Sequence, residues 1–168
     1  MDWGGAPSTL LLLPNNNELD RYTKQRYFKW LNIKCNGLEL PESLDAQVES
    51  EDLYEKIRSA GNFMREYTRD RKKHSQVYND NVAYGFARNI TSIKKAGFII
   101  SLISLMSNGL FLYFFTTFDS IHTVNYFGFI ALFTSAAGLT IHSLVLNEKF
   151  VKRRGYRYAR TLFEVCDK

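Results

Sequence analysis

Hydrophobic and polar positions are distributed very unevenly along the chain. Two long runs, 96–117 and 124–146, contain no Asp, Glu, Lys or Arg, and only six residues separate them. Each run is long enough to cross a hydrocarbon core of about 30 Å as an α-helix. Because a bilayer offers no water to backbone groups, helices are the expected form of both runs. The pattern therefore predicts a two-helix transmembrane hairpin over 96–146 with a tight turn.

Basic residues flank this hairpin on one side only. Lys94 and Lys95 precede the first run and a basic segment follows the second, whereas the turn holds no Lys or Arg. The positive-inside bias then places both termini on the cytoplasmic side, or on the matrix side of a mitochondrion. The same cations suit binding of anionic lipid such as cardiolipin, to which each would contribute about 1 kcal/mol of binding free energy. Setting the membrane topology is the alternative role of these residues. The predicted headgroup-binding residues are Lys94, Lys95, Lys149, Lys152, Arg153 and Arg154.

Polar and small residues within the two runs recur at helical spacing. Ser101, Ser104 and Asn108 share one face of the first run. Since an amide exposed to lipid is costly, we expect Asn108 to face Ser135 or a helix of another protein. The predicted helix-packing residues are Ser101, Ser104, Asn108, Ser135, Ala136 and Gly138.

His142 is the only ionisable side chain within either run. An intramembrane histidine can ligate haem or relay protons. A second haem ligand at the same depth is missing, because His122 lies at the opposite interface and His74 lies outside the runs. We expect His142 to form a hydrogen bond near the inner interface. A transport pathway through Asn108 and His142 would require oligomerisation, since two helices cannot enclose a pore.

The first 16 residues predict an extended N-terminal arm. They combine Gly and Pro with a run of four Leu, and they lack the basic segment that opens a signal peptide. We expect this arm to lie on the surface of a partner protein. Its predicted anchors are Trp3, Leu10, Leu11, Leu12 and Leu13.

Residues 17–95 predict an inner-side helical region. A basic, aromatic helix is expected from Asn15–Asn17 onward, and Ser50 is the expected N-cap of a second helix, because two acids follow it. On this second helix a narrow apolar stripe, predicted to dock on a partner helix, includes Leu53, Ile57 and Met64.

A further helix is expected to enter the first run. Asn79–Asn81 indicates a break, after which an apolar stripe leads toward the hairpin. This stripe consists of Val82, Phe86, Ile90 and Ile93. Residues 147–168, which follow the hairpin, are predicted to form a basic inner-side C-terminal tail.

Composition and charge exclude several classes of function. The net charge is +5, but residues 1–84 hold 12 basic and 13 acidic side chains, which gives little support for nucleic-acid binding. Two Cys are too few for a disulfide framework. The sequence has no phosphate-cradling Gly loop, no metal-spaced Cys/His cluster and no G-x-S-x-G motif. We therefore expect no catalytic residue, no metal and no cofactor apart from bound phospholipid.

These expectations describe an all-α membrane protein with amphipathic inner-side helices. The predicted function is that of a non-catalytic accessory subunit of a large membrane complex, whose partners are other subunits and anionic lipids. Abundant Phe (13) and Tyr (10) beside only three Pro are typical of AT-rich coding, and favour a mitochondrial inner-membrane respiratory-chain or ATP-synthase assembly. The alternative is a small two-transmembrane effector, in a bacterial inner membrane for example, that self-associates through Leu53–Tyr67 and perturbs the membrane.

Overall fold

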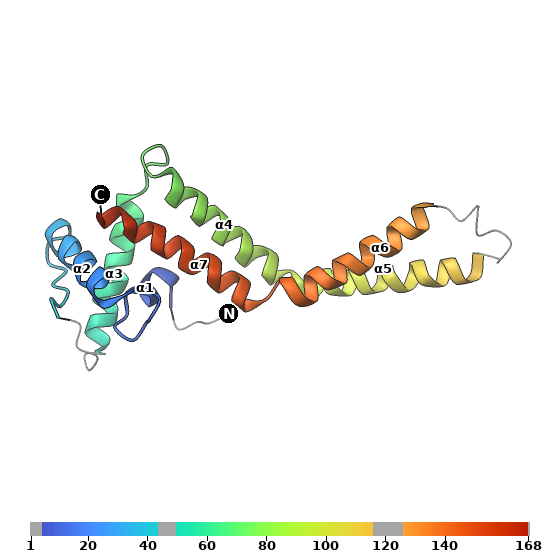
Figure 1. Cartoon of the computed structure of the whole chain (residues 1–168), viewed down its shortest axis with the longest axis horizontal. Helices are drawn as coiled ribbons and strands as arrows, with labels where there is room; N and C mark the ends of the chain where they lie inside the picture. Colours follow the sequence, from blue (N-terminus) through green and yellow to red (C-terminus); the bar gives the residue numbers. More distant parts are fainter. Residues whose placement is uncertain (1–4, 44–49, 116–125, 168) are drawn as a thin grey trace. The chain divides into compact units, whose positions relative to one another are not determined.

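A computed structural model describes residues 5–43, 50–115 and 126–167. Every regular element in these residues is helical (Figure 1), which confirms the predicted all-α class. The chain divides into two compact units. Unit 1 comprises Met1–Phe86 with Lys152–Lys168, and unit 2 comprises Ala87–Val151. Unit 1 is therefore built from both ends of the sequence, and the helices α4 and α7 connect it covalently to unit 2.

Unit 1 contains three complete helices and most of two others. The complete helices are α1 (Pro7–Leu12), α2 (Arg21–Lys34) and α3 (Glu51–Tyr67). The other two are α4 (Ser75–Ser92) and α7 (Glu148–Phe163), and a 3₁₀ turn at Glu164–Asp167 follows α7.

Side-chain caps explain where α2 and α3 begin. Asp20 Oδ1 accepts a hydrogen bond from the Thr23 amide at 2.9 Å, and Ser50 Oγ accepts one from the Leu53 amide at 3.1 Å. The predicted cap at Ser50 is confirmed. The helix expected from Asn15–Asn17 begins only at Arg21, because Asn16 Oδ1 instead accepts from the Glu18 amide at 2.8 Å and closes a turn.

The predicted extended arm is wrong for the described part of the N-terminus. Pro7 is the first residue of α1, a position where the backbone N–H has no partner within the helix, so its absence does not weaken the helix. Leu11 and Leu12 are fully buried inside unit 1, so they are not available to a partner protein. Leu10 and Leu13 are half-buried, and Trp3 lies outside the described residues.

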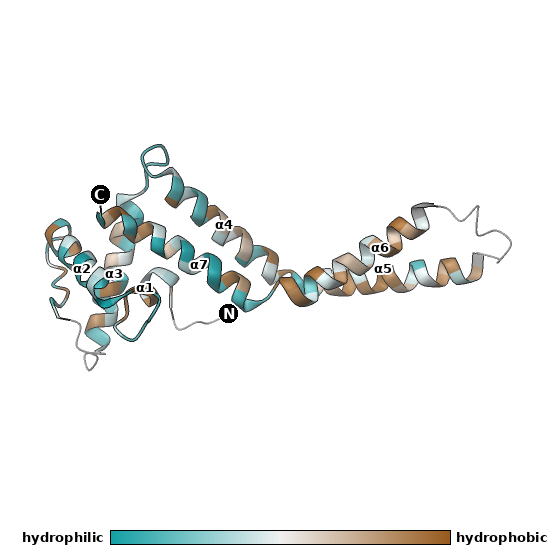
Figure 2. Ribbon diagram, in the orientation of Figure 1, coloured by the Kyte–Doolittle hydropathy of each residue, from teal (hydrophilic) through white to brown (hydrophobic). Residues whose placement is uncertain are grey.

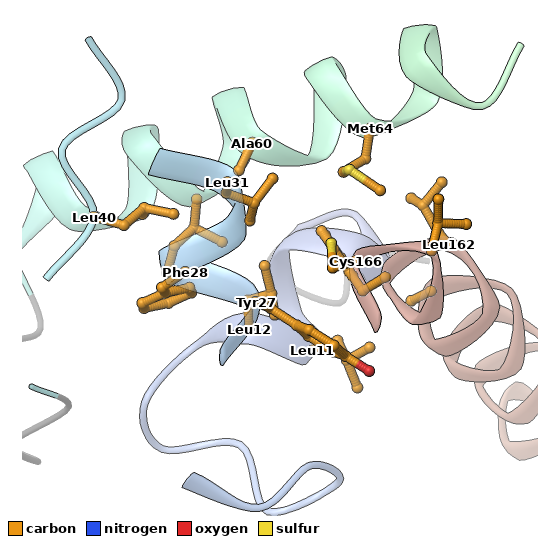
Figure 3. Close-up of a cluster of buried hydrophobic side chains, with 14 of the residues drawn as sticks. Leu11, Leu12, Tyr27, Phe28, Leu31, Leu40, Ala60, Met64, Leu162 and Cys166 are labelled. Atoms are coloured by element: carbon orange, nitrogen blue, oxygen red, sulfur yellow. The ribbon is translucent and has the colours of Figure 1, made fainter. Parts of the chain in front are cut away.

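One apolar core holds unit 1 together, and it draws on α1, α2, α3 and α7 (Figure 3). The ring of Tyr27 stacks on that of Phe163, with 6.2 Å between centroids. Burying each Leu, Ile, Met or Phe side chain contributes about 1.5–3 kcal/mol. The predicted docking of the α3 stripe on a partner helix is wrong, because its residues lie in this core. They are Leu53, Ile57 and Met64.

The C-terminal segment is a packed helix rather than a tail. On α7, one face buries Ala159, Leu162 and Phe163 against the core, while the cations lie mostly on the exposed face. Apolar residues on one face and charged residues on the other are the pattern of a helix on the surface of a core. The C-terminal helix is therefore a structural part of unit 1.

Two glycines allow α1 to approach its neighbours closely. A Cβ at Gly61 on α3 would lie 3.1 Å from Ser8 Oγ. A Cβ at Gly155 on α7 would lie 2.9 Å from Pro7 Cγ and 3.2 Å from Tyr84 Cε2. Since a proline ring has little freedom to move, the contact at Gly155 tolerates no larger side chain without a backbone shift.

A buried lysine fastens the loop between α1 and α2. Lys24 Nζ donates to the carbonyl oxygen of Leu13 at 2.7 Å and to that of Asn16, with the carbonyl of Pro14 at 3.5 Å. Burial lowers the pKa of Lys24, and these carbonyl oxygens replace the hydration that the ammonium loses. The loop therefore wraps around a cation of the following helix.

The helix α4 continues through Asn79–Asn81, so the predicted break there is wrong. Asp80 lies in the middle of this stretch and is held by α7. Its Oδ2 accepts from Thr161 Oγ1 at 2.7 Å, and its Oδ1 pairs with Arg157 Nε at 3.0 Å. These bonds outweigh the weak helix propensity of Asn and Asp. The chain turns earlier, where Thr68 Oγ1 donates to the Met64 carbonyl at 2.8 Å and ends α3.

The same bonds set the rotation of α4 about its own axis. Val77, Asp80 and Ala87 are buried, whereas Val82 is 52% exposed and Phe86 63% exposed. Ile93, just beyond the helix, is also exposed. Much of the apolar stripe that the sequence predicts on α4 therefore lies on the outer side of the helix.

Replacing Gly155 with Val should loosen the contact between α1 and α7. Overpacking against the Pro7 ring is expected to lower the free energy of unfolding of unit 1 by about 1–3 kcal/mol. Thermal unfolding of the full chain in detergent, followed by Trp fluorescence, measures this, because Trp30 packs on Tyr67 at 5.3 Å in unit 1. Gly109→Val is the control, since a Cβ at Gly109 meets nothing within 4 Å. Equal melting temperatures for the two variants would contradict the prediction.

Candidate functional site

Unit 2 contains two helices long and apolar enough to cross a membrane. They are α5 (Lys94–Phe115) and α6 (Tyr126–Thr140), which continues as a π-helical turn at Ile141–Val145. Large apolar side chains are exposed along both, and Figure 2 shows both helices as mainly hydrophobic. The predicted spans 96–117 and 124–146 match these helices, except that residues 116–125 lie outside the described part of the chain.

The two apolar helices pack against each other in antiparallel fashion. Gly97 lies against His142, Ser101 against Gly138, and Leu112 against Gly128, so that numbers rise along α5 as they fall along α6. A Cβ at Gly138 would lie 2.7 Å from Ser101 Oγ, and one at Gly97 would overlap the His142 ring. Small residues at such contacts let two helix backbones approach closely.

A chain of hydrogen bonds crosses this contact. Asn108 Nδ2 donates to the Ser104 carbonyl at 2.8 Å and lies 3.3 Å from Ser104 Oγ. Ser104 Oγ lies 2.8 Å from Ser135 Oγ, which itself donates to the Ala131 carbonyl at 2.7 Å. Asn108 therefore reaches Ser135 through Ser104 rather than directly. Among the predicted helix-packing residues, Ala136 is exposed on the outside of the pair.

The ring of His142 lies inside the contact between α5 and α6, and its Nδ1 atom does not form the hydrogen bond expected near the inner interface. Its Nδ1 atom is buried and has no partner among the described residues, and its ring covers Gly97. The helix is locally widened here, with the Leu146 amide bonded to the Ile141 carbonyl five residues back at 3.1 Å. The imidazole therefore serves as a packing surface at this end of the helix pair.

The predicted headgroup-binding cations lie on two helices. Lys94 and Lys95 stand in the first turn of α5. Lys149, Lys152 and Arg153 are exposed on the first two turns of α7, and Arg154 beside them is half-buried. Each group follows or precedes an apolar span directly in sequence, which is the position where basic residues meet lipid headgroups.

The exposed side of α2 is not among the surfaces predicted from the sequence. Tyr22 is 80% exposed and Ile33 76% exposed, although both are large and apolar. Between them lie Arg26, whose Nε pairs with Asp167 Oδ1 at 2.7 Å, and the exposed Lys29. Tyr22 lies five and six positions before the buried aromatics Tyr27 and Phe28, about 140° and 240° around the helix axis, so the helical period itself places Tyr22 on the other side of α2. We call Tyr22, Arg26, Lys29 and Ile33 the α2 face.

Cys166 is a free cysteine buried in unit 1. Burial raises the pKa of the Cys166 thiol to about 12, so it stays protonated at neutral pH and is a poor nucleophile. Within residues 5–43, 50–115 and 126–167, no three His, Cys, Asp or Glu side chains gather closely enough to hold a metal ion.

A disulfide should form readily across the α5–α6 contact. In a Cys35→Ser background, Ser104→Cys with Ser135→Cys places two thiols where the hydroxyl oxygens now lie 2.8 Å apart. Mild oxidation of the full chain in detergent should close this bond at least tenfold faster than in the control pair, Ser104→Cys with Ala136→Cys. Intact-mass measurement after thiol labelling gives both rates. Equal rates would mean that the two helices do not pack in this register.

Alkaline pH should weaken unit 1 partly through Cys166. Its folded-state pKa of about 12 exceeds its ordinary value of 9.0, so the folded state holds this proton more tightly. The resulting stability is complete below pH 9 and is lost as pH rises toward 12. Comparing unfolding free energies of wild type and Cys166→Ala between these limits should show a flatter decline in the variant. Parallel declines would contradict this assignment.

Comparisons with known proteins identify no function for this chain. No family model matches the chain, and neither a curated protein nor a solved structure is significantly similar to it.

Proposed function

We propose that this chain is a non-catalytic accessory subunit of a large membrane protein complex. In this proposal α5 and α6 form a transmembrane hairpin, and unit 1 stands on the inner side with both termini. The setting that we propose is the mitochondrial inner membrane, with a respiratory-chain or ATP-synthase assembly as the complex. A bacterial inner membrane is the alternative location.

The exposed apolar surface of unit 2 supports the membrane part of the proposal. Both spans leave bulky aliphatic and aromatic side chains open along their length. A contiguous apolar surface of this extent is unfavourable in water and favourable in hydrocarbon. The polar groups that face inward, Asn108, Ser104 and Ser135, satisfy one another, as hydrocarbon requires.

The α2 face is the observation that carries the subunit part of the proposal. Unit 1 already has a complete core, which includes Tyr27, Phe28 and Leu31 on the other side of α2. The strong exposure of Tyr22 and Ile33 therefore contributes nothing to the fold of this chain. Aromatic and Arg side chains are enriched where proteins meet. The surface suits a neighbouring subunit that offers an acidic group to the exposed Lys29.

The cations next to the spans support a role for anionic lipid. Exposed Lys149, Lys152 and Arg153 follow the second span on one helix, and Lys94 with Lys95 precedes the first. At the inner headgroup level they would each contribute about 1 kcal/mol with anionic lipid. Cardiolipin is the lipid that we propose for a mitochondrial setting.

The alternative function, a small two-transmembrane effector, would need a different surface for self-association. The Leu53–Tyr67 stripe expected to mediate it contributes Leu53, Ile57 and Met64 to the core of unit 1. Toxicity and membrane leakage on expression in bacteria are the outcomes that would favour this function over the subunit.

Gentle detergent extraction of the tagged full chain from its source, followed by a native gel and mass spectrometry, tests the proposal. The chain should migrate with a much larger assembly, and its co-migrating subunits name the process. Replacing Tyr22 and Ile33 with Ser should shift most of the chain out of that band. Ser replacements of the exposed pair Glu55 and Arg58 on α3 are the control and should leave it in place. Migration of wild type only as free chain or a small homo-oligomer would overturn the proposal.

A further inference from the structure

The edge of the His142 ring that carries both nitrogens is turned onto α5. A Cβ at Gly97 would lie 2.8 Å from His142 Nδ1 and would overlap Cε1 and Nε2. Nδ1 is enclosed and has no hydrogen-bond partner among the described residues. The Gly97 amide is already used, because it donates to the Ile93 carbonyl at 3.0 Å. Since buried polar atoms are nearly always paired, this nitrogen needs an explanation that packing alone does not supply.

The enclosed position suits a neutral imidazole and not a charged one. In the neutral ring one nitrogen carries a proton, whereas in the charged ring both nitrogens are N–H donors. Proton uptake would therefore place a charged donor at Nδ1 of His142, where no described residue accepts it. Burying a charge without a partner is far more costly than burying a neutral polar group.

The charged groups near His142 add to this cost. On α5, Lys94 lies one turn before Gly97 on the same side, and Lys95 lies on the other side. The helix α6 carries no charged residue. After the π-helical turn, α7 opens with Glu148 and Lys149, which are both exposed. Three cations are thus set against one carboxylate, a balance that disfavours a further positive charge.

The π-helical turn at Ile141–Val145 is a place where this contact can change. It is closed by the Leu146 amide, which donates to the Ile141 carbonyl at 3.1 Å, and such turns are rare and mostly single. Returning it to α-helical pairing would rotate one side of the turn by about 100° relative to the other. His142 lies only four residues before Leu146, so a ring that leaves Gly97 has a short way to the headgroup region.

We propose that His142 is an acid-sensitive latch on the inner end of the α5–α6 pair. The end is closed when the ring is neutral and opens when the ring takes up a proton. The open state holds one proton more than the closed state, so lowering the pH favours it. Because an imidazole in water protonates near pH 6.5, the ratio of open to closed molecules should rise about 30-fold from pH 8 to pH 5. The end beyond the Ser104–Ser135 hydrogen bond stays closed.

This inference goes beyond the proposed function and rests only on its membrane part. A chain that does not insert into a bilayer would overturn both. A chain that inserts but shows no response to pH would overturn the latch and leave the subunit role in place.

Distances between paired spin labels provide the first test, measured at pH 8 and pH 5 on the full chain in lipid bilayer discs. In a Cys35→Ser background, Ile100→Cys with Leu144→Cys reports on the inner end, and Leu110→Cys with Phe129→Cys reports on the outer end. All four side chains are exposed in the native chain. The inner pair should gain a longer distance at pH 5, and the outer pair should not change. An inner distance that is the same at both pH values, or an equal change at both ends, would overturn the proposal.

Two variants separate the proton from the packing. His142→Phe keeps a ring over Gly97 but takes up no proton, so its inner pair should stay closed at both pH values. In Gly97→Val the added methyl groups displace the ring at any pH, so the long distance should be present at pH 8 as well. Circular dichroism checks that both variants remain helical. Acid opening that persists in His142→Phe would show that another group responds, and would overturn the proposal.

Proton uptake is measured directly by NMR of the chain carrying ¹⁵N-labelled histidine in the same discs. The signal that disappears in His142→Phe identifies the His142 ring. Its protonation should follow the same pH dependence as the opening of the inner pair. A ring that becomes protonated while the inner pair stays closed would overturn the latch.

Discussion

The pairing of the buried Asp80 carboxylate with α7 is the interaction on which the arrangement of unit 1 and its surface depends. The carboxylate accepts from Thr161 and pairs with Arg157, and so it fixes α4 to α7 across 81 positions of sequence. Both helices lead directly in sequence to the apolar helices of unit 2. A buried charge is costly unless it is paired, so rotating α4 to hide Phe86 would leave Asp80 unpaired. The apolar outer side of α4 is thus a consequence of a polar anchor.

The core of unit 1 is complete only when the last helix, α7, packs against the first. Leu11 and Leu12 from the first helix and Leu162 and Phe163 from the last lie in one cluster. Bringing the two ends of the chain together carries a loop-closure cost that grows only slowly with the number of intervening residues. Close approach at Gly155 and the lysine clamp at Lys24 then fix α1, a helix too short to be stable alone.

Local signals in the sequence were sufficient for the elements they control directly. The apolar runs gave the two long helices of unit 2, and Ser50 followed by acids gave the start of α3. Tertiary partners decided the rest. Asn79–Asn81 stays helical because Arg157 and Thr161 hold Asp80, and neither residue is local. Asn108 was the expected partner of Ser135, whereas the Ser104 hydroxyl lies 2.8 Å from the Ser135 hydroxyl. Which polar side chain meets Ser135 depends on the rotation of the two helices, a quantity that spacing alone leaves open.

The two units are packed in ways that suit two different solvents. Unit 1 is held by large side chains, among them Phe28, Leu31 and Phe163, whose removal from water provides the driving force. The α5–α6 contact sets glycines against Ser101, Leu112 and the His142 ring and adds a serine pair, and it leaves most of the large apolar side chains outside. In lipid no hydrophobic gain accompanies helix association, so close backbone approach and hydrogen bonds must replace it. Large side chains thus point inward in unit 1 and mostly outward in the α5–α6 pair. This difference is a stronger argument for a bilayer around α5 and α6 than their length, because a helix pair in a water-soluble core would place its large side chains at the contact.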